Sequence, residues 1–191
     1  MALINRRFNS LSELQERAIN GLEVFGNKNN LSSFDNETEI LIVGTYIPHD
    51  LDYFYFGKYN HRIYGSIIDV VRKTSFDKKR KTILESNNKE EMIKRFIENL
   101  RNQKIAFLDL FEYTLINPEL VSDKSIKGFV IDTKSFEKVK KSIALKLIVP
   151  ISKDAKEILE SIIGNDPRIE YHQLINGGTN AEWIDVFKRE L

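Results

Sequence analysis

The chain has 191 residues, of which 41% are hydrophobic, and this suits one globular domain, residues 1–191, with a sizeable core. Its 29 basic residues nearly balance its 28 acidic residues, so the overall charge excludes a global attraction to nucleic acid or anionic membranes and leaves only local patches. The absence of cysteine excludes disulfides, thiolate nucleophiles and cysteine-ligated metal clusters, and no apolar run approaches the roughly 18 residues of a membrane span. We expect a cytoplasmic monomer without a membrane partner.

Four apolar runs along the chain predict strands. Each run is rich in β-branched or aromatic residues, and the four occupy residues 39–46, 104–111, 145–152 and 169–175. The second is KIAFLDLF and the third is LKLIVPIS. Their continuous apolar character is typical of strands buried on both faces.

Helical patterns separate these runs. Ser10 or Ser12 is a candidate N-cap for a first helix that runs to about Phe25. Apolar residues at helical spacing predict further helices at residues 64–74, 88–103, 134–143 and 152–163, the last with Ser152 as its N-cap. Strands that alternate with helices of this length predict a three-layer α/β/α sandwich around a mostly parallel sheet of about four strands.

Ligands of such sheets bind beyond the carboxyl ends of the strands. The first strand leads through Gly44 and Thr45 into an aromatic loop, and the second ends in Asp109, Phe111 and Glu112. The fourth is followed by the segment NGGTN at residues 176–180, where two glycines offer backbone N–H groups to an anion or simply form a tight turn. We expect these three segments to meet at one rim.

Common nucleotide and metal motifs are absent from the sequence. It contains neither GxxxxGK[ST] nor GxGxxG, so no P-loop or dinucleotide-binding fingerprint is present. His49, Asp50, Asp52 and His61 lie in one segment but share no recognised ligand spacing. We therefore expect no metal and no cofactor.

An unusual stretch, VGTYIPHDLDYFYFGKYNHRIYGSI, occupies residues 43–67. Four consecutive aromatic residues, 53–56, lead into Gly57 and then Asn60. Aromatic residues after a strand often close a sheet edge, and an asparagine before a helix is often an N-cap. Both interpretations stay open for this stretch when its residues are considered alone.

The order of these motifs resembles the uracil-DNA glycosylase superfamily. A strand ending in Gly44-Thr45-x-x-Pro48 is followed by Tyr55-Phe56-Gly57-x-x-Asn60-x-x-x-Tyr64 and a helix, as in the mismatch-specific uracil and hypoxanthine-DNA glycosylase branches. The resemblance implies base-excision DNA repair, in which the enzyme hydrolyses the N-glycosidic bond of a flipped-out uracil or hypoxanthine in DNA. Because the chain lacks cysteine, only branches without an iron–sulfur cluster remain.

The resemblance also implies roles for individual residues. Tyr55 is expected to stack on the base, and Asn60 to read its polar edge or orient the attacking water. Asp109 matches an aspartate of the hypoxanthine branch and is a second catalytic candidate, although capping a turn is its commoner role. Further base-binding candidates are Thr45, Tyr46, Gly178 and Asn180.

Two clusters of basic residues are candidates for contact with DNA phosphates. The first is the run RKTSFDKKRK at residues 72–81, in which Lys78, Lys79, Arg80 and Lys81 are consecutive. The second is one face of a predicted helix that carries Lys134, Lys138 and Lys141. Either cluster can equally be a solvated surface.

Two departures from the family pattern keep a second function open. The turn after the first strand is one residue longer and lacks the glycine after Pro48, and Tyr46 stands where several branches place a water-activating Asn, Asp or Glu. The NGGTN segment lacks the proline and the bulky intercalating residue of the second family motif. The alternative is a non-catalytic relative that binds a nucleobase, a nucleotide or a protein partner.

Overall fold

The computed structural model describes residues 3–26, 34–45, 88, 91, 98, 101–119 and 125–171. Strands β3 (Ile40–Gly44), β4 (Ile105–Asp109) and β7 (Leu147–Pro150) form a parallel sheet in the order β4-β3-β7. A parallel bridge from Ile148 to Ile169 continues the sheet beyond β7. Three of the four predicted parallel strands are therefore confirmed, the fourth run contributes one bridge at Ile169, and its residues 172–175 lie outside the described residues.

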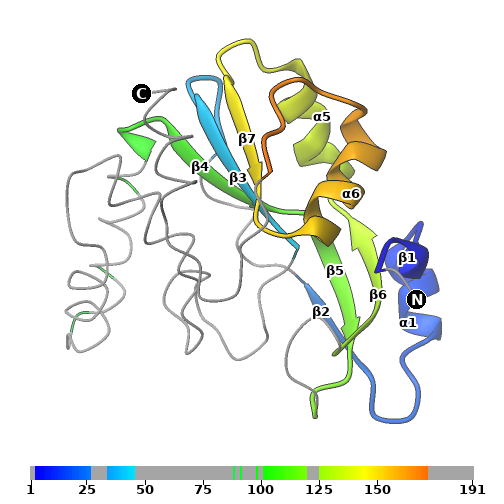
Figure 1. The fold of residues 1–191 in the computed structure, drawn as a ribbon. Helices are drawn as coiled ribbons and strands as arrows, with labels where there is room; N and C mark the ends of the chain where they lie inside the picture. Colours follow the sequence, from blue (N-terminus) through cyan, green and yellow to red (C-terminus); the bar gives the residue numbers. More distant parts are fainter. Residues whose placement is uncertain are drawn as a thin grey trace, which may run out of the picture.

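Every residue of β3, β4 and β7 is buried. Two helices flank this sheet and lie side by side, α5 (Thr133–Lys141) and α6 (Lys153–Ile163), as Figure 1 shows. Both were predicted, and Ser152 is the N-cap of α6, where its Oγ accepts a hydrogen bond from the backbone N–H of Ala155 at 3.0 Å. A parallel sheet with flanking helices confirms the α/β class.

A second, mixed sheet was not predicted. It contains β1 (Arg7–Phe8), β6 (Ile126–Ile131), β5 (Phe111–Ile116) and β2 (Glu23–Gly26), in the order β1-β6-β5-β2. Strand β5 is antiparallel to both β6 and β2, whereas β1 runs parallel to β6. This sheet left no clear apolar pattern in the sequence, because some of its strands are short and β6 contains a lysine and a glycine.

One residue, Leu110, joins the two sheets. The chain leaves β4 at Asp109 and begins β5 at Phe111, so its pairing partner changes from β3 to β6. The prediction that Phe111 and Glu112 end the second parallel strand at the rim is therefore wrong. The Phe111 ring is buried and stacks on Phe129 with 4.0 Å between ring centroids, and Glu112 is exposed on β5.

The N-terminal helix is shorter than predicted. After a 3-10 turn, η1 (Leu3–Arg6), and β1, helix α1 spans Leu11–Glu16, and the Ser10 Oγ accepts a hydrogen bond from the Glu13 N–H at 3.3 Å. The chain then turns through Asn20 and Gly21, whose φ values of 55° and 79° are left-handed. Helix α1 has already ended at its C-cap, Arg17, and this left-handed turn redirects the chain, so the next residues form β2 instead of a helix to Phe25.

The mixed sheet separates two hydrophobic cores. Its inner face joins the parallel sheet, α5 and α6 in the main core, to which Phe111, Phe129 and Ile131 belong. Its outer face packs against α1 in a smaller core. The buried members of that smaller core are Leu14, Leu115 and Val130.

Two predicted helices fall wholly or largely outside the description. The structure does not describe residues 64–74, and within 88–103 it places Glu91, Glu98 and Arg101 in helical conformation. Among the described residues, no helix has both the length and the apolar character needed to cross a membrane.

Candidate functional site

The carboxyl ends of β3 and β4 meet at one edge of the parallel sheet. Gly44 is the register partner of Asp109, and Thr45 follows Gly44 directly. The two side chains with predicted roles are buried, with 5% of Thr45 and 3% of Asp109 exposed. Thr45 and Asp109 are the predicted catalytic and base-binding residues that fall within the described ranges, and the structure brings them to one edge.

Backbone hydrogen bonds fix this edge. The Leu110 N–H donates to the Gly44 carbonyl at 2.9 Å, and the Phe111 N–H donates to the Thr45 carbonyl at 3.1 Å. On the other side of Leu110, its carbonyl accepts a hydrogen bond from the Asp132 N–H at 3.0 Å. Because Leu110 is tied to both sheets, the direction in which the chain leaves Asp109 is determined by the main chain.

The third strand adds a helix N-terminus to the same edge. The Ile151 N–H donates to the Val43 carbonyl at 3.0 Å, and α6 begins directly afterwards with Ser152 as its N-cap. The N-terminus of a helix carries partial positive charge. The carboxyl edge therefore combines a carboxylate, a hydroxyl group and a positive helix end.

Tyr171 is a residue of this edge that the sequence analysis did not single out. The bridge between Ile148 and Ile169 places Tyr171 level with the end of β7. Burial raises the pKa of its phenol. Two nearby charges on α6 have smaller effects: Lys153 lowers this pKa and Asp154 raises it. The alternating pattern of the predicted fourth strand was the only sequence signal for it.

The carboxylates with shifted pKa values lie elsewhere in the described residues. At the opposite, amino edge of the sheet, hydrogen bonds from Lys104 and Lys146 lower the pKa of Glu39. The Lys146 Nζ lies 2.7 Å from the Glu39 carboxylate. After α6, the Arg168 guanidinium lowers the pKa of Asp166 through a bond of 2.6 Å. The Glu39 pairs join segments that are distant in the sequence, whereas Asp166 and Arg168 are two residues apart, and neither carboxylate lies at the carboxyl edge. A third carboxylate with a lowered pKa, Asp35, accepts a hydrogen bond from Arg101 and also lies away from that edge.

Nine predicted site residues lie outside the described residues. They are Tyr46, Tyr55, Asn60, Lys78, Lys79, Arg80, Lys81, Gly178 and Asn180. The predicted lysine face is described, and Lys134, Lys138 and Lys141 are exposed on α5, where Lys141 lies 3.9 Å from Glu137. Within the described ranges, no group of three His, Cys, Asp or Glu side chains is arranged to hold a metal ion.

A hollow of about 480 Å³ lies on the outer face of the mixed sheet, beside α1. None of its seven lining residues was predicted to have a function. Its residues come from β1, the end of α1, the following turn, β5 and β6, so no continuous motif marks it in the sequence.

These features define an α/β protein with a polar cluster at the carboxyl edge of a parallel sheet. No protein-family model matches the chain, and no curated protein matches it. Among solved structures, the chain is similar to the solution NMR structure of a "putative Uracil DNA glycosylase from Methanosarcina acetivorans", with 18% sequence identity. The match covers 82% of this chain and 93% of that chain with a TM-score of 0.46, and similarity at this level carries no argument about function.

Proposed function

We propose that this chain is a DNA glycosylase that hydrolyses the N-glycosidic bond of uracil or hypoxanthine in DNA. The observation that supports the proposal is the register of β3 and β4, which sets Gly44 opposite Asp109. This register gathers Thr45 and Asp109 at the edge from which the chain continues into the aromatic stretch and Asn60. Ligands of parallel sheets bind at such an edge.

The proposed chemistry needs a base that has left the duplex stack. The Tyr55 ring covers one face of the flipped base, and the Asn60 amide, which both donates and accepts hydrogen bonds, reads its polar edge. The backbone N–H groups around Thr45 and Gly178 stabilise the charge on the base oxygen. These contacts discriminate a deaminated base by its carbonyl groups.

Bond cleavage leaves negative charge on the base and positive charge on the sugar. A water oxygen forms the new bond to the anomeric carbon while the electron pair of the glycosidic bond leaves with the base. The Asp109 carboxylate stabilises the positive sugar or takes the proton of the attacking water. The reaction needs neither a metal nor a covalent lysine intermediate.

Variants of Asn60 and Tyr55 test these roles by base excision and by binding to a uracil-containing oligonucleotide. Asn60→Ala abolishes excision and changes the free energy of unfolding by less than about 1 kcal/mol, as for a side chain outside a core. Tyr55→Ala weakens substrate binding by about 1 to 3 kcal/mol, and Tyr55→Phe retains most of it because the ring face does the stacking. If Asn60→Ala keeps full activity, the assignment of the catalytic role to this loop is wrong.

One observation favours a second candidate, a non-catalytic nucleobase-binding protein. Tyr46 occupies the position where a water-activating Asn, Asp or Glu is expected, and its phenol is not a base at neutral pH. A protein of this second kind binds a uracil-containing oligonucleotide more tightly than its unmodified counterpart, yet releases no base. Measuring binding and release on the same oligonucleotides separates the two candidates.

A further inference from the structure

Helix α5 begins beside the carboxyl edge of the parallel sheet and runs away from it. Its N-cap, Asp132, donates its backbone N–H to the Leu110 carbonyl at 3.0 Å, and the Leu110 N–H donates to the carbonyl of Gly44 at the end of β3. The loop after α5 reaches the amino edge, where the Lys146 N–H donates to the Glu39 carbonyl at 2.9 Å. The first turn of α5 is therefore the part of this helix nearest to a ligand at the carboxyl edge.

One face of α5 is apolar and buried, and the opposite face is basic. Phe136 and Val139 are fully buried in the main core. Lys134, Lys138 and Lys141 are exposed and recur at steps of four and three residues, which sets them in one line on the other side of the helix. At 1.5 Å per residue this line is about 10 Å long. No apolar side chain of α5 is exposed, so the basic face offers charge without an apolar anchor.

The charges on this face do not stabilise the helix. Lys134 and Lys138 are like charges at positions i and i+4, and Lys134 stands in the first turn, where the helix end is itself positive. The single acidic residue of α5, Glu137, lies 3.9 Å from Lys141. Neither Lys134 nor Lys138 has an ion-pair partner in the part of the chain that the structure describes.

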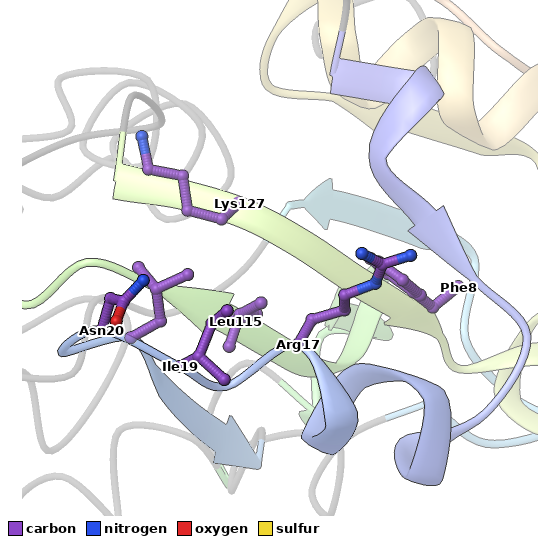
Figure 2. Close-up of a pocket in the computed structure, with 7 residues that line it drawn as sticks. Phe8, Arg17, Ile19, Asn20, Leu115 and Lys127 are labelled. Carbon is purple, nitrogen blue, oxygen red and sulfur yellow. The ribbon is translucent and has the colours of Figure 1, made fainter.

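The described lysines outside α5 all have interaction partners. They are Lys104 and Lys146 at the amino edge, Lys127 on β6, and Lys153 and Lys156 on α6. Each lysine of α6 lies within 3.6 Å of a glutamate four residues further on, and the two lysines of the amino edge share Glu39. Lys127, beside the hollow that Figure 2 shows, has an interaction of its own. The basic face of α5 is therefore the surface whose cations are left for an external anion.

We propose that the basic face of α5, formed by Lys134, Lys138 and Lys141, binds the phosphate backbone of double-stranded DNA next to the carboxyl edge. Duplex DNA carries one negative charge per about 1.7 Å of its axis, so about six phosphates lie along the 10 Å or so of this face. The inference rests on the proposed function for the identity of the polyanion, whose target base lies at the edge where α5 begins. Lysines outside the pocket then hold the DNA without reading its bases.

An anionic membrane matches this face less well. Docking to a membrane surface combines basic residues with a buried apolar side, and α5 exposes none. Ile143 is fully exposed in the loop after the helix, but one isoleucine is a weak anchor, since even a myristoyl chain gives only marginal binding.

The test measures binding of the full chain to a short, unmodified duplex by fluorescence anisotropy at several salt concentrations. The variant that combines Lys134→Gln with Lys138→Gln is expected to reduce the slope of log affinity against log salt by about 2, because each phosphate contact contributes about 0.9. The matched control combines Lys104→Gln with Lys156→Gln, two lysines that already have carboxylate partners, and should keep the wild-type slope. No binding by the wild type, an unchanged slope in the α5 variant, or an equal loss in the control would overturn the proposal.

The unmodified duplex separates this proposal from the glycosylase proposal. A protein that binds DNA through α5 but releases no base refutes only the glycosylase activity. A protein that releases base with an unchanged slope in the α5 variant refutes only the interface.

Two further variants add readouts that a folding defect does not imitate. Glu137→Gln removes the acidic residue of α5 and is expected to tighten duplex binding about two- to threefold, and weaker binding would overturn the proposal. Ile143→Ser is expected to leave duplex binding unchanged. Binding to phosphatidylserine vesicles that is tighter than to the duplex at the same salt concentration, and that Ile143→Ser weakens, would assign α5 to a membrane surface instead.

Discussion

Gly128 is the position at which one methyl group should disturb the mixed sheet most. A Cβ built there would lie 2.5 Å from Phe8 Cε2, 2.9 Å from Phe8 Cδ2 and 3.0 Å from Leu14 Cδ1. All three distances are too short for carbon atoms in contact, so the Phe8 ring has to move off β6. Such overpacking typically costs about 1 to 3 kcal/mol, and we expect Gly128→Ala to lower the free energy of unfolding by about 2 kcal/mol.

Urea unfolding measures this effect, and the midpoint should fall by about 1 M for a slope near 2 kcal/mol per molar. Gly26→Ala on β2 is the matched control, since its Cβ would meet the nearest Tyr113 ring atom at an ordinary 3.5 Å. Replacing Phe8 with leucine in the Gly128→Ala background should recover part of the loss, because a smaller side chain can yield. An unchanged midpoint in Gly128→Ala would refute the packing of Phe8 on β6.

Three further outcomes are expected from other parts of the chain. Ser152→Ala should destabilise the protein by about 1 kcal/mol in urea unfolding, because it leaves the Ala155 N–H without its cap. Arg168 lowers the pKa of Asp166, so this ion pair stabilises the fold above the ordinary carboxyl pKa of 3.8 and is lost as the pH falls through the lowered value. Asp166→Asn should therefore cost about 1 kcal/mol at pH 6 and progressively less in thermal unfolding below pH 4. Any affinity for DNA should fall steeply as the salt concentration rises. Replacing the basic run Lys78, Lys79, Arg80 and Lys81 with alanine should make the affinity depend less on salt, as measured by binding titrations at several salt concentrations.

The parallel sheet was predictable because its strands carry an unambiguous pattern. Segments such as ILIV in β3 and LIVP in β7 are apolar at every position, as burial on both faces requires. The caps were predictable for a similar reason, since Ser10 and Ser152 each precede a helical run and accept a hydrogen bond from an amide three residues later.

The mixed sheet was not predictable from such patterns. Leu14, Ala18 and Leu22 follow helical spacing, and all three contact the same small core, yet the left-handed turn at Asn20 separates a helix from a strand between them. In β6, Lys127 interrupts the apolar run, and the register with β5 shifts there, so the strand does not alternate regularly. Pairing partners, not local spacing, determine these elements.

The carboxyl edge and the hollow beside α1 also differ in how far the sequence predicts them. Thr45 and Asp109 could be predicted to converge, because parallel strands end at a common edge regardless of sequence separation. The hollow beside α1 could not be predicted, because its lining residues come from β1, the end of α1, the following turn, β5 and β6, and no continuous motif marks them. Sites built on regular topology are visible in a sequence, whereas sites built on irregularities need the structure.

Release of free base by the wild-type protein tests the glycosylase proposal most directly. Protein in excess is incubated with oligonucleotides that carry one uracil, one hypoxanthine or one xanthine, as single and double strands, and the released base is quantified by mass spectrometry. We predict release of uracil or hypoxanthine together with an abasic site in the DNA, and no release from the unmodified strand. Intact oligonucleotides after prolonged incubation, with no free base detected from any of them, would contradict it.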